Sequence, residues 1–352
     1  MNRVTVIVPC AGNSTRYPNV RPKFLLVNPS GNLMLFDSIS KLDLKNCDLV
    51  VTILGEHNEK YEIPQMLNKF FSSYKVRLCI LNKPTKSQSE TVYKTIKNLK
   101  ISGPILIKDS DNIFKLDKIY EPYNYVAVEH LKNVGITNAV NKSYTLLDDE
   151  GIIRRIAEKQ VISETFCVGG YYFTNVSDFT HSFEILGKKD SEKELYVSMI
   201  IKYLIEEKKV LFKSKSIQEY LDLGTIKEWL HYKSNQKTYF IDVDGVVVKN
   251  GGQYCKPFWG TTEGLPENIK VINRLFDLGN YIILITSRKE KYRQITVKQL
   301  KREGVKYHQL IMDLNHSSRV VINDFSKSNP FPAAISVNIP RDFDRLGDYI
   351  ND

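Results

Sequence analysis

The alternation of β-branched runs with helical patterns is the feature that most constrains the fold of this chain. The first runs are the strand patterns RVTVIVP near the start, DLVVTILG (48–55) and KVRLCIL (75–81). A helical pattern, SETVYKTIKNL (89–99), then leads into another strand, PILIK (104–108). Short apolar runs that alternate with helices favour a mostly parallel sheet flanked by helices.

The same alternation starts again near residue 236. TYFIDVD reads as a strand, PENIKVINRLFDLG (266–279) as a helix and YIILITS (281–287) as the next strand, with HQLIM and RVVIND as further strands. A length of 352 residues favours two domains. The sequence therefore predicts an α/β protein with one domain at residues 1–235 and a smaller α/β domain at 236–352.

Composition excludes several classes of protein. Hydrophobic residues make up 42% of the chain and charged residues 26%, which is typical of a folded protein. No apolar run approaches the roughly 18 residues of a membrane span, and the first residues lack a signal-peptide pattern. The five cysteines form no CxxC motif, so we expect a reduced, cytoplasmic setting. The net charge of +10 is not clustered on a basic face, which argues against nucleic acid as a partner.

The loop after the first strand reads CAGNSTRYPNVRPK (10–23). Ligands of open α/β sheets bind beyond the carboxyl ends of the strands. Small residues allow backbone amides to approach phosphate oxygens, while Arg16 and Lys23 supply fixed positive charge. The loop alone leaves a phosphate site and an ordinary turn equally open.

Five segments in order resemble the sugar-phosphate nucleotidyltransferases, whose fold is a Rossmann-like mixed sheet. Their signature loop is similar to residues 10–23, with Ser14 in place of a glycine. The other four segments are QSETVYKTI (88–96), IKDSDNIF (107–114), AEKQ…CVGGYYF (157–173) and YLDLGT (220–225). Gln160 and Tyr220 depart from the family pattern. The resemblance covers about residues 3–230.

This resemblance implies a role for each matching residue. Arg16 would hold the triphosphate and Lys23 the phosphate under attack, and Asp111 with Asp222 would bind Mg²⁺, which prefers oxygen ligands. Gln88 would read the base or merely cap a helix, and Glu194 would contact the sugar or merely begin one. The nucleotide would also be contacted by Ala11, Gly12, Asn13, Ser14 and Thr15. The sugar phosphate would be contacted by Glu158, Lys159 and Gly170.

The strand end IDVDG carries two carboxylates, Asp242 and Asp244. Such a pair is costly in a buried strand unless a cation offsets the repulsion. The motif resembles the first motif of the haloacid dehalogenase (HAD) phosphatases, which implies that Asp242 is a nucleophile and Asp244 an acid and base. Thr286 would be the second motif. Asp324 would join Asp242 and Asp244 as ligands of Mg²⁺.

The third motif of that family, a lysine, has no counterpart, because no lysine lies between Lys306 and Lys327. Arg319 or His316 would have to take its place, and Arg319 carries the fixed charge.

The stretch between Asp242 and Thr286 is also too short for a cap domain. We therefore expect another surface to cover the site: either the first domain or a second copy of the chain, with Tyr254, Phe258 and Trp259 at the contact. The alternative is that these aromatic residues pack on their own domain.

Two function classes stay open from the sequence. The first is a bifunctional enzyme that transfers a nucleotidyl group from an NTP, CTP before UTP, to a sugar or polyol phosphate, and that also hydrolyses a phosphomonoester with Mg²⁺. Its setting would be the synthesis of precursors for capsular or other surface polysaccharides. The second is an active nucleotidyltransferase whose C-terminal domain only binds a ligand or mediates assembly.

Overall fold

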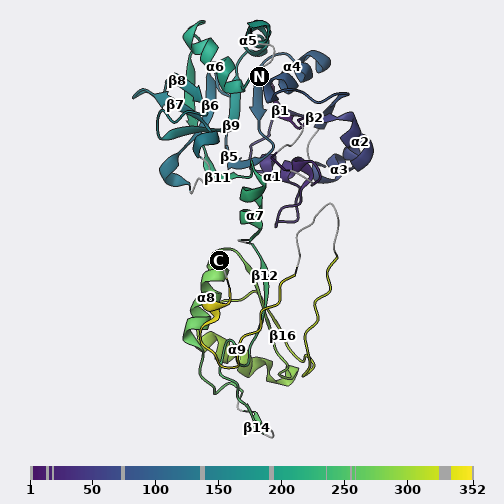
Figure 1. Ribbon diagram of the computed structural model, residues 1–352, viewed down its shortest axis with the longest axis vertical. Coiled ribbons are helices and arrows are strands. Elements are labelled where there is room, and N and C mark those ends of the chain that lie inside the picture. Colours follow the sequence, from purple (N-terminus) through teal and green to yellow (C-terminus); the bar gives the residue numbers. More distant parts are fainter. Residues whose placement is uncertain are drawn as a thin grey trace. The chain divides into compact units, whose positions relative to one another are not determined.

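The computed structural model describes residues 3–12, 16–17, 20–72, 76–134, 139–189, 194–234, 236–253, 256–257, 259–324 and 334–350. The chain divides into two compact units, Met1–Trp229 and Leu230–Asp352 (Figure 1). The boundary predicted at residue 235 lies just beyond α7 (Ile226–Ser234), the helix that spans the division. No helix in the described ranges is long and apolar enough to cross a membrane.

The first unit is built on a mixed sheet, as the sequence predicts. Its strands lie in the order β10-β6-β9-β4-β1-β2-β3, with β7 joined to β9 and β8 to β7. β4, β1, β2 and β3 run parallel, whereas β9 is antiparallel to both β4 and β6. The strands are β1 (Val4–Pro9), β2 (Cys47–Leu54), β3 (Val76–Leu81), β4 (Ile105–Lys108), β6 (Asn124–His130), β7 (Ser143–Leu147), β8 (Ile153–Glu158), β9 (Thr165–Phe173) and β10 (Phe212–Ser216).

Helices cover this sheet, and local signals set their ends. In α4, the Ser87 side chain accepts a hydrogen bond from the backbone N–H of Glu90 at 3.2 Å, and Lys100 ends the helix in a left-handed conformation. The helices are α1 (Met34–Ser40), α2 (Gly55–Tyr61), α3 (Ile63–Phe70), α4 (Gln88–Leu99), α5 (Val176–Lys189) and α6 (Val197–Glu206).

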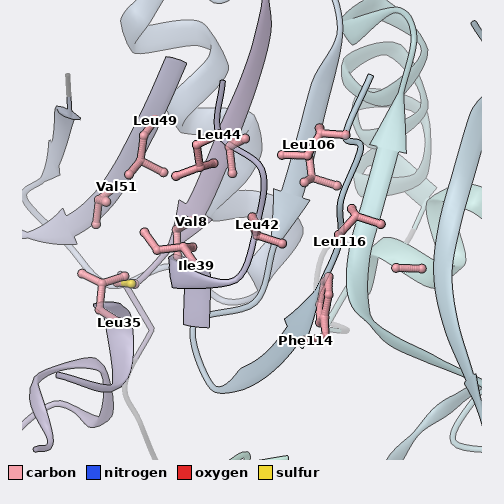
Figure 2. Packing of buried hydrophobic residues seen from close by; sticks show 14 of the residues in the cluster. Val8, Leu35, Ile39, Leu42, Leu44, Leu49, Val51, Leu106, Phe114 and Leu116 are labelled. Atoms are coloured by element: carbon pink, nitrogen blue, oxygen red, sulfur yellow. The ribbon is translucent and has the colours of Figure 1, made fainter. Parts of the chain in front are cut away.

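Two hydrophobic clusters fix the sheet between these helices. Figure 2 shows part of one cluster, where Val8, Val51 and Leu106 from three strands pack with Leu35 and Ile39 of α1. The other cluster lies against α4, α5 and α6 and includes residues such as Val92, Phe179 and Ile200. Alternate residues of the same strands supply both clusters, because side chains alternate across a sheet.

A separate two-stranded ribbon joins distant parts of the first unit. β5 (Asn112–Lys115) pairs antiparallel with β11 (Gln218–Asp222), and Asp222 lies opposite Asn112. The ribbon therefore brings together the motifs IKDSDNIF (107–114) and YLDLGT (220–225), which are far apart in the sequence.

The second unit contains a three-stranded parallel sheet in the order β12-β15-β16. Its strands are β12 (Thr238–Asp242), β15 (Tyr281–Ile285) and β16 (Gln309–Ile311), beside α8 (Pro266–Asp277) and α9 (Arg293–Arg302); β13 (Gly252–Gln253) and β14 (Lys256–Pro257) form a small hairpin. The strand expected at RVVIND is not present: residues 320–324 have no strand pairing and are exposed, with Ile322 at 89% exposure.

Candidate active sites

A cavity of about 560 Å³ lies at the carboxyl ends of the strands of the first unit. Gly12 lines it, and a side-chain carbon added at Gly12 would meet no atom within 4 Å, so the backbone there is open to a ligand. Ala11 is buried. Asn13, Ser14 and Thr15 lie outside the described residues, while Arg16 and Lys23 both line the cavity.

Asp111 and Asp222 lie side by side at this cavity. Asp111 precedes β5 and Asp222 ends β11, and the backbone N–H of Leu223 donates to the Asp111 carbonyl at 2.8 Å. A side-chain carbon added at Gly224 would be 3.2 Å from Asp222 Oδ1 and 3.7 Å from Asp111 Oδ2. The β5–β11 ribbon therefore places both carboxylates around one point.

Basic side chains surround these two carboxylates. Lys23 Nζ is 2.5 Å from Asp111 Oδ2, and Arg16 Nη2 is 3.8 Å from the same oxygen. The charges of Lys23 and Arg16 outweigh the effect of burial and hold the pKa of Asp111 well below its usual range. Lys142, which no motif indicated, donates a hydrogen bond to Asp222.

The donor set fits a magnesium ion that binds together with a substrate. Carboxylate oxygens are the ligands that Mg²⁺ prefers, and the ion usually takes one or two from the protein and completes its shell with phosphate oxygens and water. Within the described ranges, no group of three or more His, Cys, Asp or Glu side chains is placed to hold a metal by itself. Asp111 and Asp222 thus suit a nucleotide-bound ion better than a permanently bound one.

Gln88 does not point freely toward a base. It is the first residue of α4, and its side-chain amide donates to Asp109 Oδ1. Gly169 closes the other side of Asp109, since a side-chain carbon there would lie 2.2 Å from Asp109 Oδ2. Burial and then the charge of Asp111 raise the pKa of Asp109 to about 6. Asp109 is therefore an enclosed carboxylate and not a solvated loop residue.

A set of polar side chains surrounds Glu158, on β8. Ser143 and Ser198 both donate to Glu158 Oε2, the latter at 2.5 Å. Lys159 donates to the Tyr196 hydroxyl at 2.5 Å, and that hydroxyl donates to Glu194. The predicted residues Glu158, Lys159 and Glu194 therefore meet in one cavity wall.

Three members of that wall were missed by the sequence reasoning: Ser143, Tyr196 and Ser198. The signal for the last two was available, because both lie within the segment ELYVS that begins at Glu194. Nothing in the sequence marks Ser143.

Gly170 faces the core and not the cavity. A side-chain carbon at Gly170 would lie 2.9 Å from both Ala127 Cβ and Phe114 Cζ. Gly169, its neighbour, lines the cavity and has a φ of +80°, which favours glycine. The close approach of a sugar to the backbone, expected at Gly170, therefore fits Gly169 better.

The second unit holds its own group of charged residues at the carboxyl end of its sheet. Asp242 is the last residue of β12, and Thr286 follows β15, the neighbouring parallel strand. Thr286 Oγ1 donates to Asp244 Oδ2 at 3.0 Å. Asp242, Asp244 and Thr286, the three residues predicted from the first two motifs, are thus brought together.

Arg288 is the residue that the sequence reasoning missed in this site. Its Nε lies 3.1 and 3.0 Å from the two Asp244 carboxylate oxygens, and its Nη2 is 2.7 Å from Oδ1. Its Nη1 donates to Thr296 and Gln299 of α9. The Arg288 side chain is fully buried, so it fixes Asp244 to α9.

Two further arginines lie near Asp242. Arg319 Nη2 is 3.6 Å from Asp242 Oδ1 and 3.3 Å from the Ser287 hydroxyl. The side chain of Arg341 lies against Gly245, and the N–H of Asp342 donates to the Gly245 carbonyl at 2.9 Å. Burial raises the pKa of Asp242, and the charges of Arg319 and Arg341 oppose that rise. Arg319, one of the two residues proposed to substitute for the missing lysine, therefore lies beside Asp242.

The other predicted residues of this unit are placed differently. Asp324 is exposed and lies in the segment that forms no strand. Trp259 packs against Tyr292 within its own unit, with ring centroids 4.6 Å apart. Tyr254 and Phe258 lie outside the described residues. A further cavity of about 920 Å³ runs along α8 and contains none of the predicted site residues.

Comparisons with known proteins found similar proteins for both units of the chain. Residues 256–329 match the family of HAD superfamily, subfamily IIIB acid phosphatases. The matched segment includes Thr286 and Arg288 and begins after Asp242 and Asp244. The search of curated proteins found no match to this chain.

Solved structures resemble the first unit. A nucleoside-diphosphate-sugar pyrophosphorylase from Vibrio cholerae superposes with a TM-score of 0.54 at 18% identity, covering 64% of this chain and 98% of its own. A glucose-1-phosphate thymidylyltransferase from Bacillus anthracis, itself described as putative, gives 0.52 at 17% identity, covering 66% and 94%. CTP:phosphocholine cytidylyltransferase from Streptococcus pneumoniae gives 0.50 at 15% identity, covering 66% and 98%.

These findings define the folds of the two units. The first unit has the fold of the sugar-phosphate nucleotidyltransferases, and the second carries a HAD-like region. The fold predicted from the sequence, a Rossmann-like mixed-sheet domain followed by a smaller HAD-like α/β domain, is confirmed.

Proposed function

We propose that the chain is a bifunctional enzyme. Its first unit transfers a nucleotidyl group from an NTP to a sugar or polyol phosphate, and its second unit hydrolyses a phosphomonoester. The observation that carries the proposal is the placement of Asp111 close to Asp222 by the β5–β11 ribbon, beside Lys23 and Arg16. This arrangement sits in a cavity of about 560 Å³, which is large enough for a nucleotide and a small acceptor.

The transfer requires positioning and charge neutralisation rather than a covalent intermediate. An oxygen of the acceptor phosphate forms a bond to the α-phosphorus, the bond from that phosphorus to the bridging oxygen breaks, and pyrophosphate leaves. Arg16 would hold the triphosphate, and Lys23 would contact the phosphate under attack. A bound Mg²⁺, held by Asp111 and Asp222, would neutralise phosphate charge.

The polar wall supports a polyhydroxylated acceptor. Glu158, with Ser143 and Ser198 on one oxygen, offers a carboxylate that is held in one orientation, and Lys159 with Tyr196 offers donors. The sequence resemblance favours CTP and then UTP as the nucleotide. We place the reaction in the cytoplasm, in the supply of activated precursors for capsular or other surface polysaccharides.

The hydrolysis would proceed through Asp242. One Asp242 carboxylate oxygen would attack the phosphorus while Asp244 gives a proton to the departing alcohol oxygen, which forms an aspartyl-phosphate. Asp244 would then take a proton from the water that releases inorganic phosphate. Thr286 and Arg319 would bind the phosphoryl oxygens, and a bound Mg²⁺ would screen the carboxylates from the phosphate.

One observation favours a second candidate function, in which the C-terminal unit only binds a phosphorylated ligand or mediates assembly. Asp324, the third predicted ligand of Mg²⁺, lies in an exposed segment without strand pairing. A unit with only Asp242 and Asp244 and with guanidinium groups nearby would bind an anion without hydrolysing it.

A single assay tests both functions. The full chain is incubated with Mg²⁺, each of the four NTPs and a panel of sugar and polyol phosphates that includes phosphocholine, and pyrophosphate and phosphate are followed separately. Pyrophosphate release that depends on an acceptor supports the transferase. Phosphate release without an NTP supports the phosphatase, and its absence with every phosphomonoester supports the binding unit. Lack of pyrophosphate with all pairs would refute the transferase.

A further inference from the structure

Lys142 belongs to none of the motifs, yet it lies at the centre of the first site. It follows a short 3-10 turn (Ala139–Asn141) and immediately precedes β7. Its ammonium group donates to Asp222 Oδ2 and, at 3.0 Å, to the Tyr220 hydroxyl. Its side chain is only 16% exposed, so this is an enclosed ion pair and not a surface contact.

In this structure, each of the two adjacent carboxylates is bound to a lysine of its own. Lys23 is paired with Asp111 Oδ2, and Lys142 with Asp222 Oδ2. The other oxygen of Asp222 accepts the backbone N–H of Gly224 at 3.1 Å. A divalent cation that takes an oxygen from each carboxylate would lie within a few ångströms of an ammonium group, where like charges repel strongly in a partly buried site. Metal binding therefore requires a lysine to move.

Lys142 can make this move without a change in its backbone. A lysine has a flexible four-carbon stem and a charge that is not tied to one geometry. The backbone of Lys142 is fixed, because its carbonyl accepts the N–H of Lys159 at 3.0 Å. Its ammonium group can therefore swing from Asp222 while the chain stays in place. The neighbouring wall holds Ser143, Glu158 and Lys159, where the acceptor is expected.

We propose that Lys142 neutralises Asp222 in the metal-free protein and transfers to the phosphate of the acceptor when the metal ion binds. We call this ion pair a gate, because it keeps Asp222 in position and lowers the affinity of Asp222 for a metal ion. The gate opens when the phosphate of a substrate binds the Lys142 ammonium group. Lys142 then contacts the attacking phosphate directly. This role rests on the proposed nucleotidyl transfer, but its metal-free part is measurable without that reaction.

The test compares Lys142→Met and Lys142→Arg with Lys115→Met. Lys115, at the end of β5, forms an exposed ion pair with Asp117 at 3.6 Å, so its substitution makes the same change of net charge on the ribbon that carries Asp222. Mn²⁺ is titrated into each protein without substrates and followed by electron paramagnetic resonance. We expect Lys142→Met to bind Mn²⁺ about fivefold more tightly than wild type. Lys142→Arg and Lys115→Met should stay near the wild-type affinity.

Kinetics then test the second half of the proposal. In Lys142→Met, kcat/KM for the acceptor should fall about a hundredfold, as for other lost contacts to developing charge, while the KM for the NTP stays the same. Mn²⁺ affinity equal to wild type in Lys142→Met would overturn the gate, and an unchanged kcat/KM for the acceptor would overturn the phosphate contact. If the wild-type protein releases no pyrophosphate with any combination of NTP and acceptor phosphate, the proposed transferase activity is refuted. Tighter Mn²⁺ binding by Lys142→Met would then still support the gate.

Discussion

Replacement of Arg288 by methionine should destabilise the second unit and disable its site together. The Arg288 side chain is fully buried, whereas that of Asp244 keeps 19% exposure. Removal of one partner of a buried ion pair costs about 3–5 kcal/mol, because the other charge is left without compensation. Since Asp244 can regain some contact with water, we expect a loss near the lower end, about 3 kcal/mol in the free energy of unfolding.

The measurement uses the fluorescence of Trp259 during urea denaturation. The chain has two tryptophans, so a Trp229→Phe background leaves Trp259, which packs on Tyr292, as the reporter of the second unit. A loss of about 3 kcal/mol with an m-value of about 2 kcal/mol/M would lower the urea midpoint by about 1.5 M. Phosphate release, where wild type shows it, should be lost, because Asp244 is no longer oriented toward Thr286.

Lys306→Met is the matched control in the same unit. Lys306 pairs with Asp277 at 2.8 Å, but both side chains are about half exposed, so its loss should cost at most about 1 kcal/mol. The double variant Arg288→Met with Asp244→Asn should recover part of the stability, because the uncompensated charge is gone. Equal midpoints for Arg288→Met and Lys306→Met would refute the reasoning that the buried pair holds this site together.

Three other predictions concern the separate sites. Asp242→Asn should abolish phosphate release and leave pyrophosphate release near wild type, whereas Asp111→Asn should do the reverse; loss of both activities in either folded variant contradicts two independent sites. Gly169→Ala should destabilise the first unit and stop nucleotidyl transfer, because its new carbon would lie 2.2 Å from Asp109 Oδ2; thermal unfolding and pyrophosphate assays check this. Burial and the charge of Asp111 raise the pKa of Asp109 from 3.8 to about 6. The folded state therefore binds the Asp109 proton more tightly than the unfolded state. The free energy of unfolding of the metal-free protein should fall as the pH rises from about 4 to about 6. Asp109→Asn should remove that loss in urea titrations across this range, and an unchanged pH dependence would mean that Asp109 titrates normally.

The order of strands and helices was predictable because it depends on local pattern. β-branched runs such as VTVIVP and LVVTIL form adjacent parallel strands, and Ser87 begins α4 where the helical pattern begins. Asp111 and Asp222 were predictable as a pair only through the resemblance, since their contact depends on the β5–β11 ribbon that joins distant segments. No local pattern in either segment encodes that register.

The missed residues share a physical cause. Lys142 and Ser143 reach the cavity from the start of β7, and Tyr196 reaches it from the residue before α6. Each is an ordinary polar residue in its own segment. Arg288 could have been found, because it lies three residues after a buried strand. An arginine keeps its positive charge, so one that lies in the core needs a carboxylate partner. Asp244, two residues beyond the end of the adjacent strand β12, is that carboxylate.

Arg319 and Asp324 cannot both take their predicted roles in the same conformation of the chain. A strand rises about 3.3 Å per residue, so an extended segment from Arg319 to Asp324 separates its ends by about 17 Å. If that segment paired in parallel beside β12, Asp324 would lie near Asp242 and Arg319 would lie at the opposite end of the sheet. The structure shows the other arrangement: Arg319 is 3.6 Å from Asp242 and also contacts Ser287, while residues 320–324 are exposed and form no strand. The charge that faces Asp242 here is therefore the guanidinium of Arg319, and the placement of Asp324 beside a metal ion requires that this contact first be broken.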